Sequence, residues 1–190
     1  MVTNYTCERF IPGINGSVSV EHLHRYILAR QLSSELDVLD IACGEGYGSA
    51  LVAEVANSVV GVDIDLGTIN EALSKYKAPN LSFIQGDCAN IPHPNNSFDL
   101  VISFETIEHH DKQSEMLREI RRVLRPDGVI LISSPNRPEF NRGRNEPYPY
   151  HVRELDYNEF NSLLCEEFKN VEFYGQKSTF GSLVITLHEQ

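Results

Sequence analysis

The sequence predicts an α/β fold in which a doubly wound, mostly parallel sheet carries helices on both faces. Two features of the 190 residues support this prediction: short apolar runs alternate with longer amphipathic segments, and a glycine turn follows the first apolar run. Alternation of this kind indicates strand–helix–strand units and a parallel sheet. Their crossovers are right-handed, and ligands bind at the carboxyl ends of the strands. We therefore expect the functional site at that edge of the sheet.

Five apolar runs predict the strands of this sheet. They cover residues 36–42, 59–63, 81–85, 98–104 and 129–134. Helices are expected between and around them, at residues 20–32, 46–56, 66–77, 112–124 and 156–166. The helix at 112–124 has the clearest pattern, because Met116, Leu117 and Ile120 fall on one face at helical spacing.

The regular alternation ends after the fifth predicted strand. Residues 135–152 contain four prolines, three arginines and two tyrosines and show no periodicity. A segment of this length without regular structure is usually functional or disordered, so we expect a substrate loop here. Two strand-like runs, at 169–174 and 183–187, predict an antiparallel pair at the edge of the sheet. No repeat or linker divides the chain, so a single domain over residues 1–190 is expected, with residues 1–34 as a lid or substrate segment.

The composition narrows the possible partners. Sixteen Lys and Arg residues against 27 Asp and Glu give a net charge of −11. A polyanion must be met by a basic face, so this balance argues against binding to nucleic acid or to an anionic membrane. The four cysteines form no C-x-x-C pair, and the first residues lack the basic and apolar regions of a secretory signal. Because no apolar run approaches the ~18 residues of a membrane span, we expect a cytoplasmic protein without membrane insertion.

The segment VLDIACGEGYGS, residues 38–49, carries the most specific signal. A strand ends there in a glycine turn and a helix begins, so the backbone can approach a ligand closely and the helix offers unpaired N–H groups. Asp63 ends the next strand, 19 residues after Gly44, which is about where a carboxylate accepts hydrogen bonds from a ribose. Two nucleoside cofactors fit this pattern, a dinucleotide and S-adenosylmethionine.

Glycine spacing and charge separate these two cofactors. A dinucleotide fingerprint requires G-x-G-x-x-G, but the position that should hold the third glycine after Gly44 and Gly46 is Ser49. Asp40, inside the strand before the turn, would repel a pyrophosphate and is expected to face a ligand ammonium. The pattern therefore favours a nucleoside that bears an amino acid, and it disfavours a nicotinamide-dependent oxidoreductase.

Five segments, taken in order, resemble the motifs of the class I S-adenosylmethionine-dependent methyltransferases. They are LDIACGEGYG, VVGVDID, FIQGDCANIP, FDLVISFETIEHH and EIRRVLRPDGVILISSPN. The resemblance implies a Rossmann-like fold, with S-adenosyl-L-methionine as the cofactor. It also implies that Asp63 binds the ribose, that Ile64 lies beside the adenine and that Asp87 meets the adenine amino group. Together with the turn, the expected cofactor-binding residues are Asp40, Ala42, Gly44, Gly46, Asp63, Ile64, Asp87, Cys88, Ser103, Phe104 and Glu105.

Three shorter segments, ERFIPG, EHLHRY and HVREL, resemble parts of methyltransferase domains found with glycosyltransferases in cell-surface polysaccharide assembly. This second resemblance implies a small polar acceptor, a hydroxyl of a sugar or of a saccharide-linked substrate. A phenolic, quinone-like or other small metabolite, methylated on oxygen, nitrogen or carbon, is an alternative. A non-catalytic module that binds S-adenosylmethionine and scaffolds a larger assembly is another.

A hydroxyl acceptor must lose its proton, and histidine titrates in the useful range. His109 follows the fourth predicted strand, and the Glu108–His109 pair matches the family pattern. We therefore expect His109 to be the catalytic base, with a packed or capping role as the alternative. The histidines show no H-x-x-x-H spacing, so no metal site of the usual form is expected. A divalent ion held by separate loops and the substrate is left open.

The expected substrate-binding residues lie outside the cofactor motifs. The arginines of the 135–152 segment form a candidate clamp for a phosphate or carboxylate, or else belong to a solvated surface loop. Tyr26 is expected to form part of an aromatic lid over the sulfonium, with ordinary helix packing as the alternative. The predicted set is Arg9, Tyr26, Arg137, Arg142 and His151.

Overall fold

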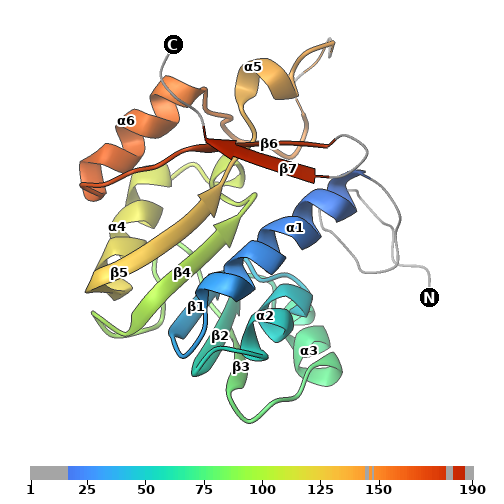
Figure 1. The fold of residues 1–190 in the computed structure, drawn as a ribbon, viewed down its shortest axis with the longest axis vertical. Coiled ribbons are helices and arrows are strands. Elements are labelled where there is room, and N and C mark those ends of the chain that lie inside the picture. The colour runs from blue at the N-terminus through green and yellow to red at the C-terminus, as the bar shows by residue number, and fades with distance from the viewer. Residues whose placement is uncertain (1–16, 144–145, 147, 179–181, 187–190) are drawn as a thin grey trace.

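The computed structural model describes residues 17–143, 146, 148–178 and 182–186 and contains a five-stranded parallel sheet (Figure 1). The strands are β1 (Asp37–Ile41), β2 (Ser58–Asp63), β3 (Leu81–Gln85), β4 (Phe98–Phe104) and β5 (Leu124–Ser133). Their order in the sheet is β3–β2–β1–β4–β5. The winding direction therefore reverses between β1 and β4, and ligands of such sheets bind outside the carboxyl ends of the strands at this switch point. The predicted α/β class is confirmed.

Helices cover both faces of the sheet, as predicted (Figure 1). They are α1 (Ser17–Leu32), α2 (Tyr47–Ala53) and α3 (Leu66–Lys75) on one face, and α4 (Gln113–Val123) and α6 (Tyr157–Glu167) on the other. Each face has its own apolar core, with Tyr26 and Val52 in one and Leu117 and Leu164 in the other. Burial of such side chains, worth about 1.5–3 kcal/mol each, holds the layers together. In the part of the chain that the structure describes, no helix combines the length and apolar character needed to cross a membrane.

Side chains along β1 point alternately to the two faces of the sheet. Leu39 and Ile41 belong to the core beneath α4, whereas Val38 belongs to the core beneath α1 and α2. Because successive residues of a strand point to opposite faces, Asp40 shares the face of Val38. Its carboxylate accordingly meets side chains of α1 and α2.

The carboxyl-terminal strands differ from the prediction in place and extent. β6 (Tyr174–Ser178) and β7 (Ser182–Thr186) form the expected antiparallel pair, but as a two-stranded sheet of their own. The placement at the edge of the parallel sheet was therefore wrong. β6 instead lies against α1 (Figure 1), where Arg25 Nη1 donates to Gln176 Oε1 at 2.6 Å and Gln176 Nε2 donates to the carbonyl of Glu21 at 3.1 Å.

The start of β5 and the structure of the 135–152 segment also differ from the prediction. β5 begins at Leu124, which pairs with Phe98, and the next pair is Leu100 with Val129. The residues between them bulge out of the ladder, so the strand starts five residues before the predicted position. The 135–152 segment also has structure of its own, because it contains the short helix α5 (Arg137–Phe140).

Backbone hydrogen bonds tie the end of this segment to the turn that follows β4. That turn is the 3₁₀ helix η1 (Ile107–His109). The amides of Val152 and Arg153 both donate to the carbonyl oxygen of Glu108, at 2.8 and 3.1 Å. A segment from late in the chain is thereby fixed beside the carboxyl end of a central strand.

Candidate functional site

A sharp turn after β1 brings the backbone to the switch point of the sheet. Ala42, Gly44 and Gly46 all have positive φ, of 55°, 56° and 87°. Glycine adopts this conformation without strain, whereas Ala42 holds it at a cost. A Cβ on Gly46 would lie 2.6 Å from the ring of Phe83, but one on Gly44 would meet nothing within 4 Å. Gly46 therefore permits close packing, and Gly44 leaves open space beside the turn.

The carboxylate of Asp63 is fixed beside this turn. Its Oδ2 accepts a hydrogen bond from the amide of Gly44 at 3.0 Å, and its Oδ1 accepts one from the amide of Asp65 at 3.0 Å. A carboxylate oxygen can accept more than one hydrogen bond, so a carboxylate held in this way can also bind a pair of hydroxyl groups. This is the geometry expected of a ribose-binding acid at the end of β2.

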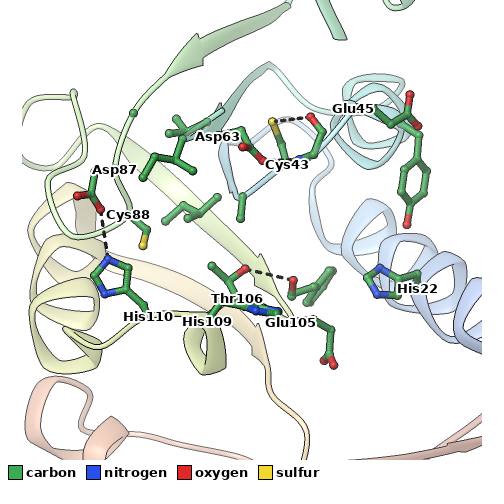
Figure 2. A pocket seen from close by; sticks show the side chains of 18 of the residues that line it. His22, Cys43, Glu45, Asp63, Asp87, Cys88, Glu105, Thr106, His109 and His110 are labelled. Atoms are coloured by element: carbon green, nitrogen blue, oxygen red, sulfur yellow. Dashed lines mark hydrogen bonds and ion pairs between the residues drawn. The ribbon is translucent and has the colours of Figure 1, made fainter. Parts of the chain in front are cut away.

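A cavity of about 330 Å³ opens over the carboxyl ends of the strands. Figure 2 shows Asp87 and His110 at one end of it and His22 at the other, with Asp63 between them. Four carboxylates, those of Glu45, Asp63, Asp87 and Glu105, are part of the lining. Glu45 pairs with Lys75 at 2.9 Å and Glu105 lies 3.7 Å from Arg25, so Asp63 and Asp87 contribute most of the negative charge that favours a cationic ligand. The predicted site residues that line the cavity are Tyr26, Ala42, Gly44, Asp63, Ile64, Asp87, Cys88, Phe104, Glu105 and His109.

Three predicted cofactor residues lie outside the lining: Asp40, Gly46 and Ser103. The expectation that Asp40 faces a ligand ammonium was wrong, because its side chain is completely buried. It accepts hydrogen bonds from Ser49 Oγ at 2.6 Å and from the Tyr26 hydroxyl at 3.1 Å. Asp40 thus joins α1 and α2 beneath the turn. Ser103 is also fully buried, and its Oγ has no hydrogen-bond partner among the described residues.

Burial raises the pKa of Asp40 from 3.8 to about 7, against the opposing effect of its hydrogen bonds from Ser49 and Tyr26. The folded state therefore binds this proton more tightly than the unfolded chain, and stability falls as the pH rises from about 4 to about 7. Asparagine cannot ionise. We therefore expect Asp40→Asn to remove this part of the pH-dependent fall in the free energy of unfolding, which amounts to about 4 kcal/mol at most. Urea unfolding at a series of pH values measures the change.

Asp37, on the same strand, is a control because its pKa is shifted in the opposite direction. Hydrogen bonds from Ser58, Arg125 and Asn57 lower its pKa, so its contribution is present above the unfolded pKa and is lost as the pH falls. Asp37→Asn should flatten only the acid side of the stability curve. A decline toward neutral pH that persists unchanged in Asp40→Asn would refute the assignment.

Several lining residues were missed at the level of sequence. They include the polar residues His22, Glu45, Tyr47, Thr106 and His110. His22 lies four residues before Tyr26 on α1, and residues at this spacing share a helix face, so its position could have been inferred from that of Tyr26. Burial and the neighbouring Arg25 lower the pKa of His22 to about 4. It is therefore neutral at physiological pH.

His109 lies at the floor of the cavity, on η1. Its Nδ1 is 2.9 Å from the carbonyl oxygen of Tyr150. A carbonyl oxygen can only accept, so Nδ1 carries the hydrogen and Nε2 holds the free lone pair. The ring of His151 packs edge-on against that of His109, with centroids 4.9 Å apart. His151 itself does not line the cavity, so it lies behind His109 and does not face the acceptor pocket as predicted.

The two described arginines of the predicted clamp pair with nearby acids, and the third, Arg144, lies outside the described residues. Arg137 pairs with Asp156 at 2.8 Å and with Glu159 at 2.6 Å, and Arg142 pairs with Glu139 at 2.6 Å. Neither arginine lines the cavity. Their charges are partly neutralised by nearby acids, and Arg137 fixes the start of α6. Arg9 lies outside the described residues.

Residues 39–132 match the protein family described as a methyltransferase domain. The doubly wound sheet, the glycine turn and the acid-lined cavity at the switch point all agree with this match. This part of the chain is a class I S-adenosylmethionine-dependent methyltransferase domain with a Rossmann-like fold. S-adenosylmethionine is the cofactor of this class, and the lining residues suit it, since they offer a fixed ribose-binding acid and a negative surface for the cationic sulfonium.

Most of the chain is similar to each of two curated mycobacterial proteins. It is 40% identical over 162 residues to a probable S-adenosylmethionine-dependent methyltransferase of Mycolicibacterium smegmatis, covering 84% of this chain and 62% of that protein. It is 38% identical over 168 residues to a probable S-adenosylmethionine-dependent methyltransferase of Mycobacterium tuberculosis, covering 87% of this chain and 61% of that protein. The chain therefore spans about three fifths of the length of these relatives.

Solved structures share the fold. The YcgJ protein of Bacillus subtilis superposes with a TM-score of 0.66 at 26% identity, covering 83% of this chain and 71% of that one. The similarity extends beyond residues 39–132, which agrees with a sheet and helices that continue past the matched segment.

Proposed function

We propose that the protein transfers the methyl group of S-adenosylmethionine to a hydroxyl of a small polar acceptor, a sugar or a saccharide-linked substrate. The observation that carries this proposal is the position of His109, which faces the same cavity as the ribose-binding acid Asp63. When bound, S-adenosylmethionine supplies an electrophilic methyl group on a positively charged sulfur. The protein then has to align the acceptor and exclude water.

The two ends of the cavity suggest how the cofactor lies. Asp87 and Cys88 lie at the end of the cavity away from His22 (Figure 2), where the adenine would bind, with Ile64 also in the lining. Phe104 packs against Tyr26 of α1, and Glu105 interacts electrostatically with His22, so these two residues would hold the methionine part. The side chain of Glu105 is itself fixed, because Ser133 Oγ donates to its Oε1 at 2.6 Å. This carboxylate would face the ammonium group in the role first assigned to Asp40.

His109 is the group proposed to activate the acceptor. The lone pair on its Nε2 accepts the proton of the hydroxyl as the new oxygen–carbon bond forms and the sulfur–carbon bond breaks. Thr106, beside His109 in the lining, offers a hydroxyl group as a hydrogen-bond partner for a further hydroxyl of the acceptor. A polar lining at this end supports a polyhydroxylated acceptor.

Titration calorimetry with S-adenosylhomocysteine and NADH on the same preparation tests the cofactor half of the proposal. We expect micromolar binding of S-adenosylhomocysteine and no binding of NADH, because Ser49 replaces the third glycine of a dinucleotide fingerprint. Measurement of turnover with sugar and phenol acceptors then tests the proposed class of methyl acceptor. Binding of NADH alone would contradict the assignment. Binding of S-adenosylhomocysteine with no turnover on any acceptor would favour a non-catalytic scaffold.

A further inference from the structure

Three potential metal ligands converge behind the acceptor end of the cavity. One ligand atom each from Glu108, His109 and His151 lies within 4.8 Å of the other two. Glu108 and His109 come from η1 after β4, whereas His151 comes from the segment before α6. The backbone bonds from Val152 and Arg153 to the carbonyl of Glu108 hold the two segments in this register.

Glu108 has an unusual environment for a carboxylate. The residue is 1% exposed, and its Oε2 is buried without a hydrogen-bond partner in the described part of the chain. A buried polar atom that lacks a partner destabilises the folded state, and more so if it is charged. Two further carboxylates, Glu105 and Glu154, lie close enough to interact with it electrostatically. A cation would satisfy this oxygen and offset the surrounding negative charge.

Both imidazoles are already oriented in the manner of metal ligands. Nδ1 of His109 bonds to the Tyr150 carbonyl at 2.9 Å, and Nδ1 of His151 bonds to Glu154 Oε1 at 2.8 Å. Metal-binding histidines almost always direct one ring N–H to a carbonyl or carboxylate, which fixes the tautomer and leaves the other nitrogen for the metal. Glu154 is fixed in turn by a 2.6 Å hydrogen bond from Asn141 Nδ2.

We propose that Glu108, His109 and His151 bind a divalent transition-metal ion beside the acceptor end of the cavity. Two imidazoles and one carboxylate form a ligand set that suits Zn²⁺, with a fourth position left for water or substrate. Because His109 lines the cavity, that open position faces the acceptor. Glu154 acts as a positioning residue through His151.

The metal site would add to the proposed function, and its effect on the acceptor hydroxyl rests on that function. A metal ion that coordinates the acceptor hydroxyl lowers the pKa of that group. The proton is then released to water, and Nε2 of His109 serves as a ligand in place of a free base. An ion whose coordination expands from four to five would bind a second, neighbouring hydroxyl of the same sugar.

Metal binding can be measured without any methyl transfer. The tag-free chain, stripped with a chelator, is titrated with Zn²⁺ by calorimetry and with Co²⁺ by visible absorbance, which reports the coordination geometry. We expect one ion per chain and a tetrahedral or five-coordinate Co²⁺ spectrum. His151→Gln and Glu108→Gln should abolish this binding, and Glu154→Gln should weaken it about 10–100-fold.

His110→Gln is the matched control. His110 is adjacent to His109 but belongs, with Asp87 and Cys88, to a second group of potential metal ligands. Its replacement should therefore leave the ion at Glu108, His109 and His151 in place, and loss of the ion in His110→Gln would assign it to the second group. Thermal unfolding of each variant, compared with that of the parent chain, shows whether it is folded.

The proposal is overturned if the parent chain binds no Zn²⁺, if His151→Gln binds it as tightly as the parent, or if the ion is lost in His110→Gln and retained in His109→Gln. Methyl transfer at full rate in the presence of a chelator would reject a metal ion in the reaction and would leave the proposed function intact. Failure of the parent chain to bind S-adenosylhomocysteine would reject the proposed function whatever the metal result.

Discussion

Replacing Asp63 with asparagine is expected to weaken binding of S-adenosylhomocysteine about 10–100-fold, because each hydrogen bond to a charged group contributes roughly 1.5–3 kcal/mol. The loss has two sources. The charge that would hold the ribose hydroxyls disappears, and the amide group of asparagine has one accepting oxygen where two backbone N–H groups now donate. One of the donors from Gly44 or Asp65 then faces an NH₂ group, which also disturbs the glycine turn. Calorimetry measures the affinity, and thermal unfolding measures the stability.

Asp65→Asn is the matched control for this experiment. Asp65 caps α3 by accepting hydrogen bonds from the amides of Gly67 and Thr68, and it does not line the cavity. Asparagine is a comparable capping residue, so affinity for S-adenosylhomocysteine should change little. Equal affinity in Asp63→Asn and the parent would show that the ribose does not bind at the end of β2.

His109→Gln is expected to reduce turnover about 10²–10⁴-fold, the usual contribution of a group that assists proton transfer. Binding of S-adenosylhomocysteine should be nearly unchanged, because His109 lies at the acceptor end of the cavity. The pH–rate profile should also lose the limb that reports this imidazole. Near-normal turnover with an unchanged profile would show that His109 is a packing residue.

His151→Gln distinguishes the two ways in which His109 could act. A free base at His109 needs no ligand behind it, so the loss of His151 should change turnover only slightly. A metal ligand requires the complete set, so the loss of His151 should reduce turnover about as much as the loss of His109. The two outcomes separate base catalysis from metal assistance in a single comparison of kcat.

The sheet and its glycine turn were predictable because they depend on local patterns. Strands buried on both faces are nearly continuous apolar runs, and the prediction for β4 matches the observed bounds, 98–104. The position of Asp63 followed from its place at the end of β2. These features are fixed by residues close together in the sequence, and sequence spacing therefore describes them well.

The acceptor end was less predictable because it depends on contacts between distant segments. The orientation of Asp40 could have been inferred, since Val38 and Asp40 share one face of β1. The pairing of Arg137 with Asp156 and Glu159 could not, because it depends on how α5 packs beside α6. The approach of His151 to Glu108 depends likewise on bonds across some 40 residues of chain.

The two backbone bonds from Val152 and Arg153 to Glu108 have a consequence for which side chains of the 135–152 segment can be replaced. They attach the 135–152 segment to η1 through main-chain atoms, which every amino acid except proline can supply. Side chains of the segment can therefore be exchanged while its anchor stays in place, and β1 and β2 with their cofactor-binding turn are not disturbed. Replacement of these side chains and the geometry of the cofactor-binding turn are therefore largely independent of each other in this fold.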